Sequence, residues 1–364
     1  MKITIFISAL SGGGAERVTC NLANYLSDFG HTVEILTMGD APVAEPLREN
    51  VKHTTLLSNK EKSNFLLNNA KRIFRLGRHM KKEPVDAYVV MLPKTTQLML
   101  RLSFLTKAPI IVSERADPKV YSSRTQKSLQ KLASKASGWV FQTNEARDWY
   151  LPHLRGTSQK IIPNAINPVF LRAPYTGDRA RVIVGTGRLN EQKNFALLIS
   201  SFALIANKFP EYKLVIYGKG SLLESLQSLA REKGIADRVE FPGFVSDMPQ
   251  RLERASLFVL SSDYEGMPNA LMEAMALGLP CVSTDCGGGG ARFLIQSGEN
   301  GILVPQKDEL KMAEAIQKIL TDKEFAAKLG NNARKIQQTL APEKIYGEWE
   351  QFILEQIKTC HNKG

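Results

Sequence analysis

The stretch from Leu257 to Thr284, LFVLSSDYEGMPNALMEAMALGLPCVST, constrains the fold of this chain most tightly, because it predicts a complete βαβ unit. It opens with a short apolar run, Leu257–Ser262, which is typical of a buried parallel strand. Residues 269–277 are rich in helix formers, and the glycine and proline at positions 278 and 280 predict the end of that helix. A second apolar run follows. Two parallel strands joined by a helix favour an open α/β sheet.

Two carboxylates flank the predicted start of this helix. Glu265 lies in the loop after the strand, and Glu273 lies eight residues later in the helix. Ligands of open parallel sheets bind at the carboxyl ends of strands, where this loop lies. The helix start offers unpaired N–H groups and a favourable dipole to phosphate, whereas carboxylates are suited to hydroxyl groups. The pattern indicates a nucleotide sugar, with a predicted anion site at Gly266, Met267, Pro268, Asn269 and Ala270.

The pair Glu265 and Glu273, within EGMPNALMEAMALGLPCVST, resembles the E-x7-E signature of family 4 retaining glycosyltransferases of the GT-B fold. Three further segments resemble that family in the same order: SGGGAERV near the start, IPNAIN in the middle and GRLNEQKN just after it. The resemblance covers essentially the whole chain. It implies an α/β protein with two Rossmann-like, doubly wound parallel-sheet domains that face each other across a cleft. If the two glutamates are considered without the other segments, the alternative is an ordinary surface pair of glutamates on a buried α/β unit.

The length of 364 residues predicts two domains. We place the boundary near Ala173, because residues 168–178 contain two prolines, a glycine and few apolar side chains. The acceptor-binding domain then spans residues 1–173 and the donor-binding domain residues 174–341, and the resemblance implies that a last helix, about residues 342–360, packs back onto the first domain. The chain has no run of 18 apolar residues and no metal-type cysteine spacing, so we expect a cytosolic protein with reduced cysteines.

The positive charge of the chain is concentrated in its first half. The net charge is +12; residues 1–173 hold 25 Lys and Arg against 13 Asp and Glu, whereas residues 174–364 hold 23 of each. We therefore expect an anionic partner at the first domain. A nucleic-acid partner is not expected, because the basic segments show neither a recognition motif nor aromatic residues interleaved throughout them.

Residues 60–82, KEKSNFLLNNAKRIFRLGRHMKK, predict a basic amphipathic helix. An apolar stripe is approximated by Phe65, Leu66, Asn69, Ile73, Leu76 and Met80, and basic residues that include Lys71, Arg72, Arg75 and Arg78 cover the rest. Such a helix is typical of contact with an anionic membrane surface or another polyanion. The alternative is a solvated basic face on a helix packed by its stripe. A second basic helix face is predicted by Arg124, Lys127, Lys131 and Lys135.

Two loops of the first domain are further candidates for binding. The glycine loop at residues 11–14 follows a predicted strand but lacks the GxGxxG pattern, so it argues against a nicotinamide cofactor. Gly13 and Gly14 permit close approach of the donor diphosphate or the acceptor, and Glu16 either reaches the ligand or complements the helix start. Relatives often have Ser-Glu-His where this chain has Ser-Glu-Arg at positions 113–115. This departure removes a histidine role, and Glu114 or Arg115 is expected to hold the acceptor instead.

The resemblance assigns the donor diphosphate to Arg188 and Lys193, two cations that follow a predicted strand. A planar guanidinium and a mobile ammonium suit a diphosphate, although two unrelated surface cations are the alternative. The loop at Gly218 is a further donor contact, and backbone groups at Gly243 and Phe244 are expected to hold the nucleobase.

The resemblance implies a retaining, metal-independent transferase that needs no cofactor besides its donor. We expect a UDP-linked galactose or N-acetylgalactosamine donor and a polyprenyl-pyrophosphate-linked oligosaccharide acceptor, with the enzyme peripheral at the inner face of the cytoplasmic membrane. The alternatives are a UDP-sugar epimerase on the same fold and a non-catalytic protein that binds an anionic membrane or nucleic acid.

Overall fold

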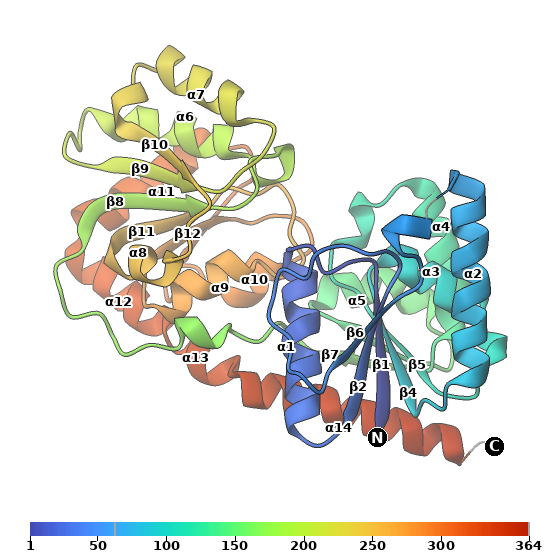
Figure 1. The fold of residues 1–364 in the computed structure, drawn as a ribbon. Coiled ribbons are helices and arrows are strands. Elements are labelled where there is room, and N and C mark those ends of the chain that lie inside the picture. The colour runs from blue at the N-terminus through green and yellow to red at the C-terminus, as the bar shows by residue number, and fades with distance from the viewer. Residues whose placement is uncertain (62, 363–364) are drawn as a thin grey trace. The chain divides into compact units, whose positions relative to one another are not determined.

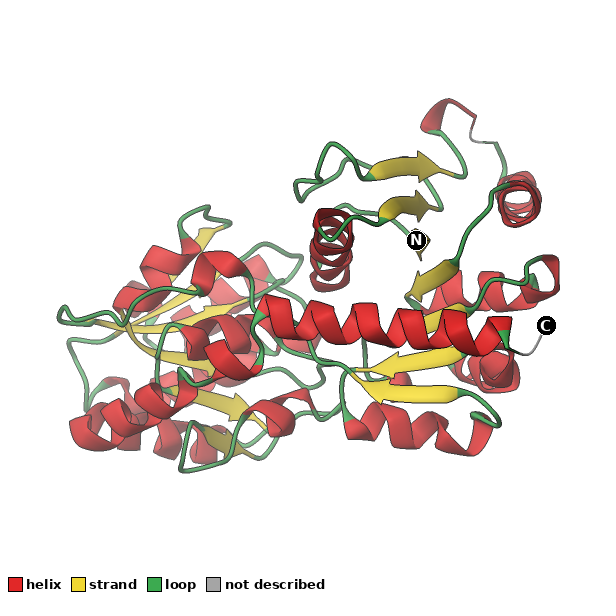
Figure 2. Cartoon of the chain, turned by 90° about the horizontal axis from the view of Figure 1, so that it is seen from below, coloured by secondary structure: helices red, strands yellow, loops and turns green. Residues whose placement is uncertain are grey.

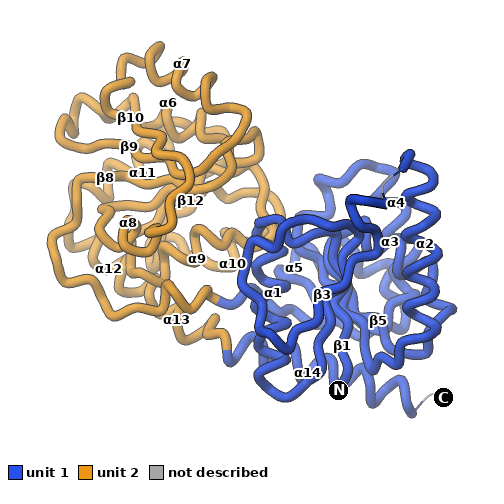
Figure 3. Tube along the Cα trace, in the orientation of Figure 1, with its two compact units in different colours: residues 1–165, 343–364 blue, residues 166–342 orange. Residues whose placement is uncertain are grey.

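The computed structural model describes residues 1–61 and 63–362, and Figure 1 traces them as a ribbon. The chain forms two compact units, residues 1–165 with 343–364 and residues 166–342 (Figure 3). The first segment of the first unit thus ends at Ala165, eight residues before the boundary expected near Ala173. Each unit is a parallel sheet with helices on both sides of its strands (Figure 2).

Within the described residues, the first sheet has seven parallel strands in the order β3-β2-β1-β4-β5-β6-β7. Its central strands are apolar runs buried on both faces, as expected where helices cover a parallel sheet. The strands are β1 (Lys2–Ile7), β2 (Thr32–Thr37), β3 (Lys52–Thr55), β4 (Ala87–Met91), β5 (Ile110–Ser113), β6 (Gly138–Phe141) and β7 (Ser158–Ile161).

The second sheet has six parallel strands in the described residues, in the order β10-β9-β8-β11-β12-β13. The strands are β8 (Ala180–Thr186), β9 (Lys213–Tyr217), β10 (Val239–Gly243), β11 (Ala255–Leu260), β12 (Cys281–Thr284) and β13 (Ile302–Val304). The stretch that opened the sequence analysis forms β11, a helix and β12, so its predicted βαβ unit is confirmed.

Both sheets reverse their direction of growth once. The first adds strands outward from β1 to β3 and then crosses back to place β4 beside β1. The second adds strands from β8 to β10 and then places β11 beside β8. The carboxyl ends of β1 and β4, and of β8 and β11, are therefore the switch points at which doubly wound sheets bind ligands. The predicted fold class of two Rossmann-like sheets is confirmed.

Helices connect the strands of both units. Those of the first unit are α1 (Gly14–Asp28), α2 (Phe65–Lys82), α3 (Pro93–Arg101), α4 (Ser123–Leu132), α5 (Asn144–Tyr150) and α14 (Pro342–His361). Those of the second unit are α6 (Phe195–Ala206), α7 (Leu223–Glu232), α8 (Met248–Arg254), α9 (Asn269–Ala276), α10 (Gly290–Leu294), α11 (Glu309–Thr321), α12 (Lys323–Ala333) and α13 (Ile336–Thr339). None of the helices in the described part of the chain is both long enough and apolar enough to cross a membrane.

The basic helix α2 differs from its prediction in two respects. It begins at Phe65 rather than near residue 60, because the Asn64 side chain caps it by accepting from the Leu67 N–H. A short turn, η1 (Asn59–Glu61), precedes it, and Lys62 lies outside the described residues. Of the predicted apolar stripe, only Leu76 and Met80 are buried, whereas Phe65, Leu66 and Ile73 are exposed.

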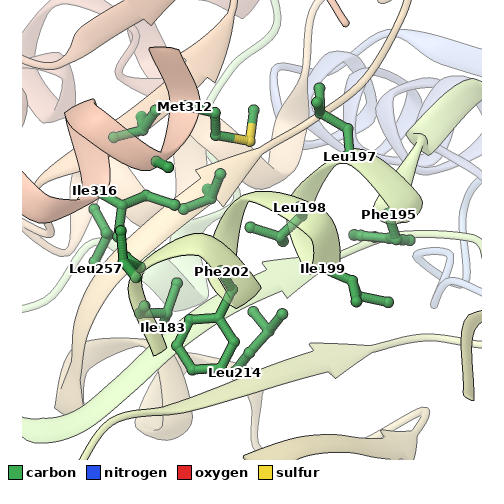
Figure 4. Packing of buried hydrophobic residues seen from close by; sticks show 14 of the residues in the cluster. Ile183, Phe195, Leu197, Leu198, Ile199, Phe202, Leu214, Leu257, Met312 and Ile316 are labelled. Atoms are coloured by element: carbon green, nitrogen blue, oxygen red, sulfur yellow. The ribbon is translucent and has the colours of Figure 1, made fainter. Parts of the chain in front are cut away.

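The core of the second unit packs α6 and α11 against the sheet. Phe195 and Phe202 of α6 and Met312 of α11 lie among apolar side chains of the strands (Figure 4). The α6 sequence FALLISSFALIA is apolar on nearly all sides, which matches a helix buried between the sheet and its neighbours. This packing holds β8 and β11, whose carboxyl ends form the switch point.

The last helix, α14, belongs to the first unit apart from its first residue and lies along the amino ends of that unit's strands (Figure 2). His31, just before β2, pairs with Glu350 at 2.7 Å. Phe352 packs against Gly138, the first residue of β6. The Cys360 thiol donates to the Lys107 carbonyl, before β5, at 3.1 Å. The carboxyl ends of the strands are thereby left to ligands.

Candidate functional site

Two predicted site residues meet at the switch point of the second sheet. Lys193 Nζ, after β8, lies 2.5 Å from Glu265 Oε1, after β11, and their side chains are only 15% and 9% exposed. Ser262 Oγ, itself buried, donates to the same carboxylate oxygen at 2.8 Å. From the sequence, these two charged groups are expected at different parts of the donor, Lys193 at the diphosphate and Glu265 at hydroxyl groups. The structure places them as one ion pair.

Hydrogen bonds hold the two segments on either side of this ion pair together. Gln192 Nε2 donates to the Tyr264 carbonyl at 3.0 Å. Asn194, whose φ is 42°, donates from Nδ2 to Asp263 Oδ1 at 2.9 Å and also caps α6. A left-handed asparagine allows the chain to turn sharply from β8 into that helix. The ion pair is therefore presented by a cross-linked framework.

The predicted phosphate site lies at the start of α9, immediately after Glu265. The helix begins at Asn269, after Pro268 with its extended backbone, and the positive end of its dipole favours an anion at this position. Glu273 lies in α9 and is 8% exposed. The structure thus places in one loop and helix all five predicted residues of this site, namely Gly266, Met267, Pro268, Asn269 and Ala270.

Close backbone packing fixes this loop. The Glu265 N–H donates to the Gly287 carbonyl at 2.9 Å. Gly290, the first residue of α10, approaches the Gly266 carbonyl so closely that a Cβ at position 290 would overlap it. Gly290 is therefore required by the close approach of two loops, a role that the sequence does not indicate.

The remaining donor candidates follow β8, β9 and β10. Arg188 is exposed and makes no side-chain hydrogen bond within the described residues. Gly218, with φ of 139°, packs on the Gly187 carbonyl, and its N–H donates to the Gly243 carbonyl at 2.9 Å. Phe244 extends into solvent with 77% of its surface exposed. These loops therefore expose two cations, Arg188 and Lys219, and the aromatic ring of Phe244.

Cys286 lies near the ion pair but is not suited to be a nucleophile. Burial raises the pKa of this thiol to about 12, and the Glu265 carboxylate adds to the rise. The thiolate is the reactive form of cysteine, so Cys286 remains a neutral thiol near neutral pH.

In the first unit, the glycine loop leads directly into α1, with Gly13 as the N-cap and Gly14 as the first helical residue. The Glu16 carboxylate folds back over Gly13, where it complements the positive end of the helix dipole. This geometry corresponds to the second of the two alternatives raised for Glu16.

Glu114 and Arg115 are interior residues. The Glu114 carboxylate accepts hydrogen bonds from the hydroxyls of Tyr121 and Tyr150 at 2.5 and 2.8 Å, and from two backbone N–H groups. Burial raises the pKa of Glu114 despite these donors. Burial also lowers the pKa of Arg115 to about 10, and its guanidinium donates to Asn164. Three of the four donors contact Oε1 of Glu114 and only Tyr150 contacts Oε2, and the acceptor contact expected of Glu114 or Arg115 stays a prediction.

The four predicted cations of α2 have different surroundings. Arg75 makes two bonds to the Glu61 carboxylate, at 2.8 and 2.5 Å, and Lys71 donates to the Glu61 carbonyl at 2.9 Å. Arg72 Nε donates to the Met38 carbonyl at 2.9 Å, whereas Arg78 is exposed. Glu61 therefore already binds Lys71 and Arg75, two of the cations that were predicted to bind the acceptor.

Three polar residues of the donor edge are not singled out by the sequence: Asn194, Ser262 and Asp263. Ser262 and Asp263 follow β11 closely, so their position at the carboxyl end of a predicted strand is a usable signal. Asn194 is the last residue of the segment GRLNEQKN, but its contact with Asp263 spans 69 positions, so no local pattern shows that contact.

Comparison with protein families matches both units. Residues 12–170 match the family described as Glycosyltransferase Family 4, and residues 173–336 match Glycosyl transferases group 1.

Two relatives from Campylobacter jejuni match nearly the whole chain. The GalNAc-alpha-(1->4)-GalNAc-alpha-(1->3)-diNAcBac-PP-undecaprenol alpha-1,4-N-acetyl-D-galactosaminyltransferase is 26% identical over 367 residues, which cover 98% of this chain and 99% of the relative. The N-acetylgalactosamine-N,N'-diacetylbacillosaminyl-diphospho-undecaprenol 4-alpha-N-acetylgalactosaminyltransferase is 27% identical over 374 residues, covering 97% and 99%. Among solved structures, Anabaena Alr3699/HepE in complex with UDP and glucose aligns with a TM-score of 0.85 and 19% identity over 98% of this chain and 100% of that one, which shows a shared fold.

Proposed function

Since the chain belongs to glycosyltransferase family 4, we propose that it moves a hexose or N-acetylhexosamine, of the galactose or N-acetylgalactosamine type, from a UDP-sugar to a polyprenyl-diphosphate-linked glycan. In this proposal the second unit binds the donor and the first unit binds the acceptor. Support comes from the names of both Campylobacter jejuni relatives, which join N-acetylgalactosaminyl transfer to an undecaprenol-linked substrate. A neighbour of the same fold was crystallised with UDP-glucose.

The ion pair of Lys193 and Glu265 is the observation on which the donor site rests. It lies at the switch point, beside a helix start suited to phosphate. A donor diphosphate that approaches Arg188 and the start of α9 would also attract the Lys193 ammonium. The Glu265 carboxylate, held by Ser262, would then accept hydrogen bonds from sugar hydroxyls. Glu273, farther along α9, is proposed to hold the ribose hydroxyls.

The proposed reaction breaks the bond between the anomeric carbon and the diphosphate oxygen and joins that carbon to an acceptor hydroxyl oxygen. The acceptor proton passes to the departing phosphate oxygen, and UDP is released. Arg188, Lys193 and the helix start stabilise the charge that develops on the leaving diphosphate, which is commonly the largest catalytic contribution. No enzyme-bound intermediate is required in this scheme.

Retention of anomeric configuration and independence of metal ions are further parts of the proposal. Two cations and a helix start can together balance the diphosphate charge that a divalent ion balances in other enzymes. The anomeric configuration of the product is measured by NMR. Turnover is expected to be unchanged by EDTA, and a loss that Mg²⁺ or Mn²⁺ restores would refute metal independence.

We also propose that the first unit attaches peripherally to the inner face of the cytoplasmic membrane. The first half of the chain holds the whole net positive charge, and α2 exposes Phe65, Leu66 and Phe74 to between 70% and 76%. Exposed apolar residues beside basic ones are typical of interfacial helices. Sedimentation with anionic but not zwitterionic vesicles, weakened by salt, is the expected result.

The first test of the function is a donor screen. Purified protein is incubated with UDP-Gal, UDP-GalNAc, UDP-Glc, UDP-GlcNAc and GDP-Man, with and without a polyprenyl-diphosphate-linked glycan, and released nucleotide is measured. We expect one UDP-sugar to be turned over. Lys193→Ala and Glu265→Gln should each lower kcat by about 10²–10³, since each removes a group that acts on the transition state. Lys213→Gln, an exposed lysine at the start of β9, is the matched control.

Each outcome of the screen has a distinct meaning. Release of UDP that is lost in both site variants and kept in the control supports the proposal. Conversion of one UDP-sugar into another without release of UDP would replace it with the epimerase alternative. Absence of turnover with every donor and acceptor, together with absence of nucleotide binding, would reject a transferase and favour a binding protein.

A further inference from the structure

A pocket of about 580 Å³ opens in the first unit at its own switch point. It lies beside Ser8, directly after β1, and beside Met38 and Gly39, directly after β2, while residues of α2 and α3 form its walls. Since α3 follows β4, the pocket lies where the order of the first sheet reverses. The equivalent position of the second sheet holds the Lys193–Glu265 pair.

Three cations line this pocket: Arg72 from α2, and Lys94 and Arg101 from α3. The other residues that line the pocket, within the described part of the chain, include no aspartate or glutamate. Arg72 is oriented by its bond to the Met38 carbonyl at 2.9 Å, and Arg101 by a bond to Ser128 Oγ at 3.1 Å. Lys94 is exposed. Three positive charges without a carboxylate favour a ligand with more than one negative charge, such as a diphosphate.

The pocket also has an apolar wall. Phe65 and Ile73 of α2 and Leu98 of α3 line it. Phe65 is 76% exposed and Ile73 is 47% exposed, so the wall is open to solvent. Exposed apolar side chains beside a cation cluster fit a ligand that joins an apolar chain to its charged group, and a diphosphate alone would leave this wall uncovered.

The backbone at the edge of the pocket is strained. Leu92, the last residue before α3, has φ of 73° and ψ of 151°, a conformation that residues other than glycine rarely adopt. Thr95 and Thr96 hold it by donating to the Leu92 carbonyl at 2.9 Å each. The turn starts α3 abruptly after β4 and so sets Lys94 at the rim. Strain of this kind is concentrated at functional sites.

We propose that this pocket binds the diphosphate and the adjoining isoprene units of the acceptor's lipid carrier. Arg72, Lys94 and Arg101 bind the diphosphate, and Phe65, Ile73 and Leu98 contact the isoprenoid chain. The inference rests on the proposed function and deepens it, because it assigns the lipid end of the acceptor to specific residues. It also moves that role away from Lys71 and Arg75, which Glu61 occupies.

The test measures binding of farnesyl diphosphate to the full-length protein by titration calorimetry, with inorganic diphosphate and farnesol as partial ligands. Farnesyl diphosphate is expected to bind at least tenfold more tightly than either partial ligand. Lys94→Gln and Arg101→Gln should each weaken its binding about tenfold, because each removes a charged hydrogen-bond donor. Phe65→Ala should weaken binding of farnesyl diphosphate and leave that of diphosphate unchanged. Lys81→Gln removes the same charge from α2 outside the pocket and should leave both unchanged.

Three results would overturn the inference: no binding of farnesyl diphosphate, equal affinity for inorganic diphosphate, or an equal loss in Lys81→Gln, which would indicate non-specific attraction to a basic surface. Release of UDP in the donor screen is measured on the same preparations. If UDP is released but farnesyl diphosphate does not bind, only this inference fails. If farnesyl diphosphate binds in the expected pattern but no donor is turned over, the pocket stands and the proposed function fails.

Discussion

Glu34 of β2 is a buried carboxylate that three polar side chains contact. Its carboxylate accepts from Thr54 Oγ1 at 2.6 Å, lies 2.9 Å from His79 Nε2 of α2, and lies 3.2 Å from Lys52 Nζ. Burial acts to raise the pKa of Glu34, but the hydrogen bonds of His79 and Thr54 outweigh it and lower the pKa from 4.5 to about 2. One buried carboxylate therefore joins β2, β3 and the basic helix.

This lowered pKa predicts how acid affects the first unit. Because the folded pKa lies below the unfolded value, the stabilisation of about 3 kcal/mol is present above pH 4.5 and lost as the pH falls toward 2. In Glu34→Gln we expect lower stability at pH 7 and a shallower decline between pH 5 and pH 3. All three tryptophans, Trp139, Trp149 and Trp349, lie in the first unit, so urea unfolding followed by their fluorescence measures it selectively.

Lys52→Gln is the control for this experiment. The Lys52 side chain is 65% exposed, so its loss should cost less than about 1 kcal/mol. Identical pH profiles for wild type and Glu34→Gln would contradict the assignment of acid sensitivity to this carboxylate.

At this scale the sequence indicates candidate donor residues but not their contacts. Arg188, Lys193, Glu265 and Glu273 are candidates because each follows a predicted strand or lies in a recognisable motif. The bond between Lys193 and Glu265 spans 72 positions and depends on which strands are neighbours, which local patterns do not specify. The partners of Glu114 are not predicted for a related reason: Tyr121 and Tyr150 reach it only in the folded unit.

At the scale of elements, the loop after β11 packs closely against the start of α10. Adding a single methyl group at this contact should disturb it. Gly290→Ala would force its Cβ against the Gly266 carbonyl. We expect a loss of about 1–3 kcal/mol in the stability of the second unit, because backbone must move to relieve the overlap, and weaker UDP binding. Thermal unfolding by circular dichroism and UDP titration measure the two effects.

Gly347→Ala in α14 is the matched control. Its added Cβ would meet the Tyr25 hydroxyl at an ordinary 3.7 Å, and alanine favours a helix interior. Stability should stay equal or rise by up to about 1 kcal/mol. If both variants behave alike, the close approach of the two loops has no energetic consequence.

The elements themselves were predicted well where the sequence is strongly periodic, as in β11, α9 and β12. The helix α2 shows the limit of periodicity. Its pattern gave an apolar stripe and a basic face, but a stripe does not reveal whether anything covers it. Leu76 and Met80 face the sheet, whereas Phe65 and Ile73 extend beyond it to the open pocket, a distinction that only the packed unit provides.

At the scale of the whole molecule, the division into two units predicts how each part of the chain folds when it is expressed alone. Residues 166–342 have their own sheet and their own apolar core, so this fragment should fold cooperatively when expressed alone. UDP should raise its thermal unfolding temperature, because a ligand stabilises the state that binds it. A fragment of residues 1–165 should not fold stably, because it lacks α14. An unfolded second fragment, or a stable first one, would contradict this division.

The return of α14 to the first unit has a consequence for biosynthesis. Residues 1–165 leave the ribosome first, yet Trp349, Phe352 and Ile353, which are buried in the finished unit, are made only after residues 166–342. Domains generally fold as units during synthesis. The nascent chain therefore completes its domains in the reverse of the order in which it begins them. Until α14 emerges, the amino ends of the first sheet stay uncovered, and this is the interval in which a chaperone has an apolar surface to protect.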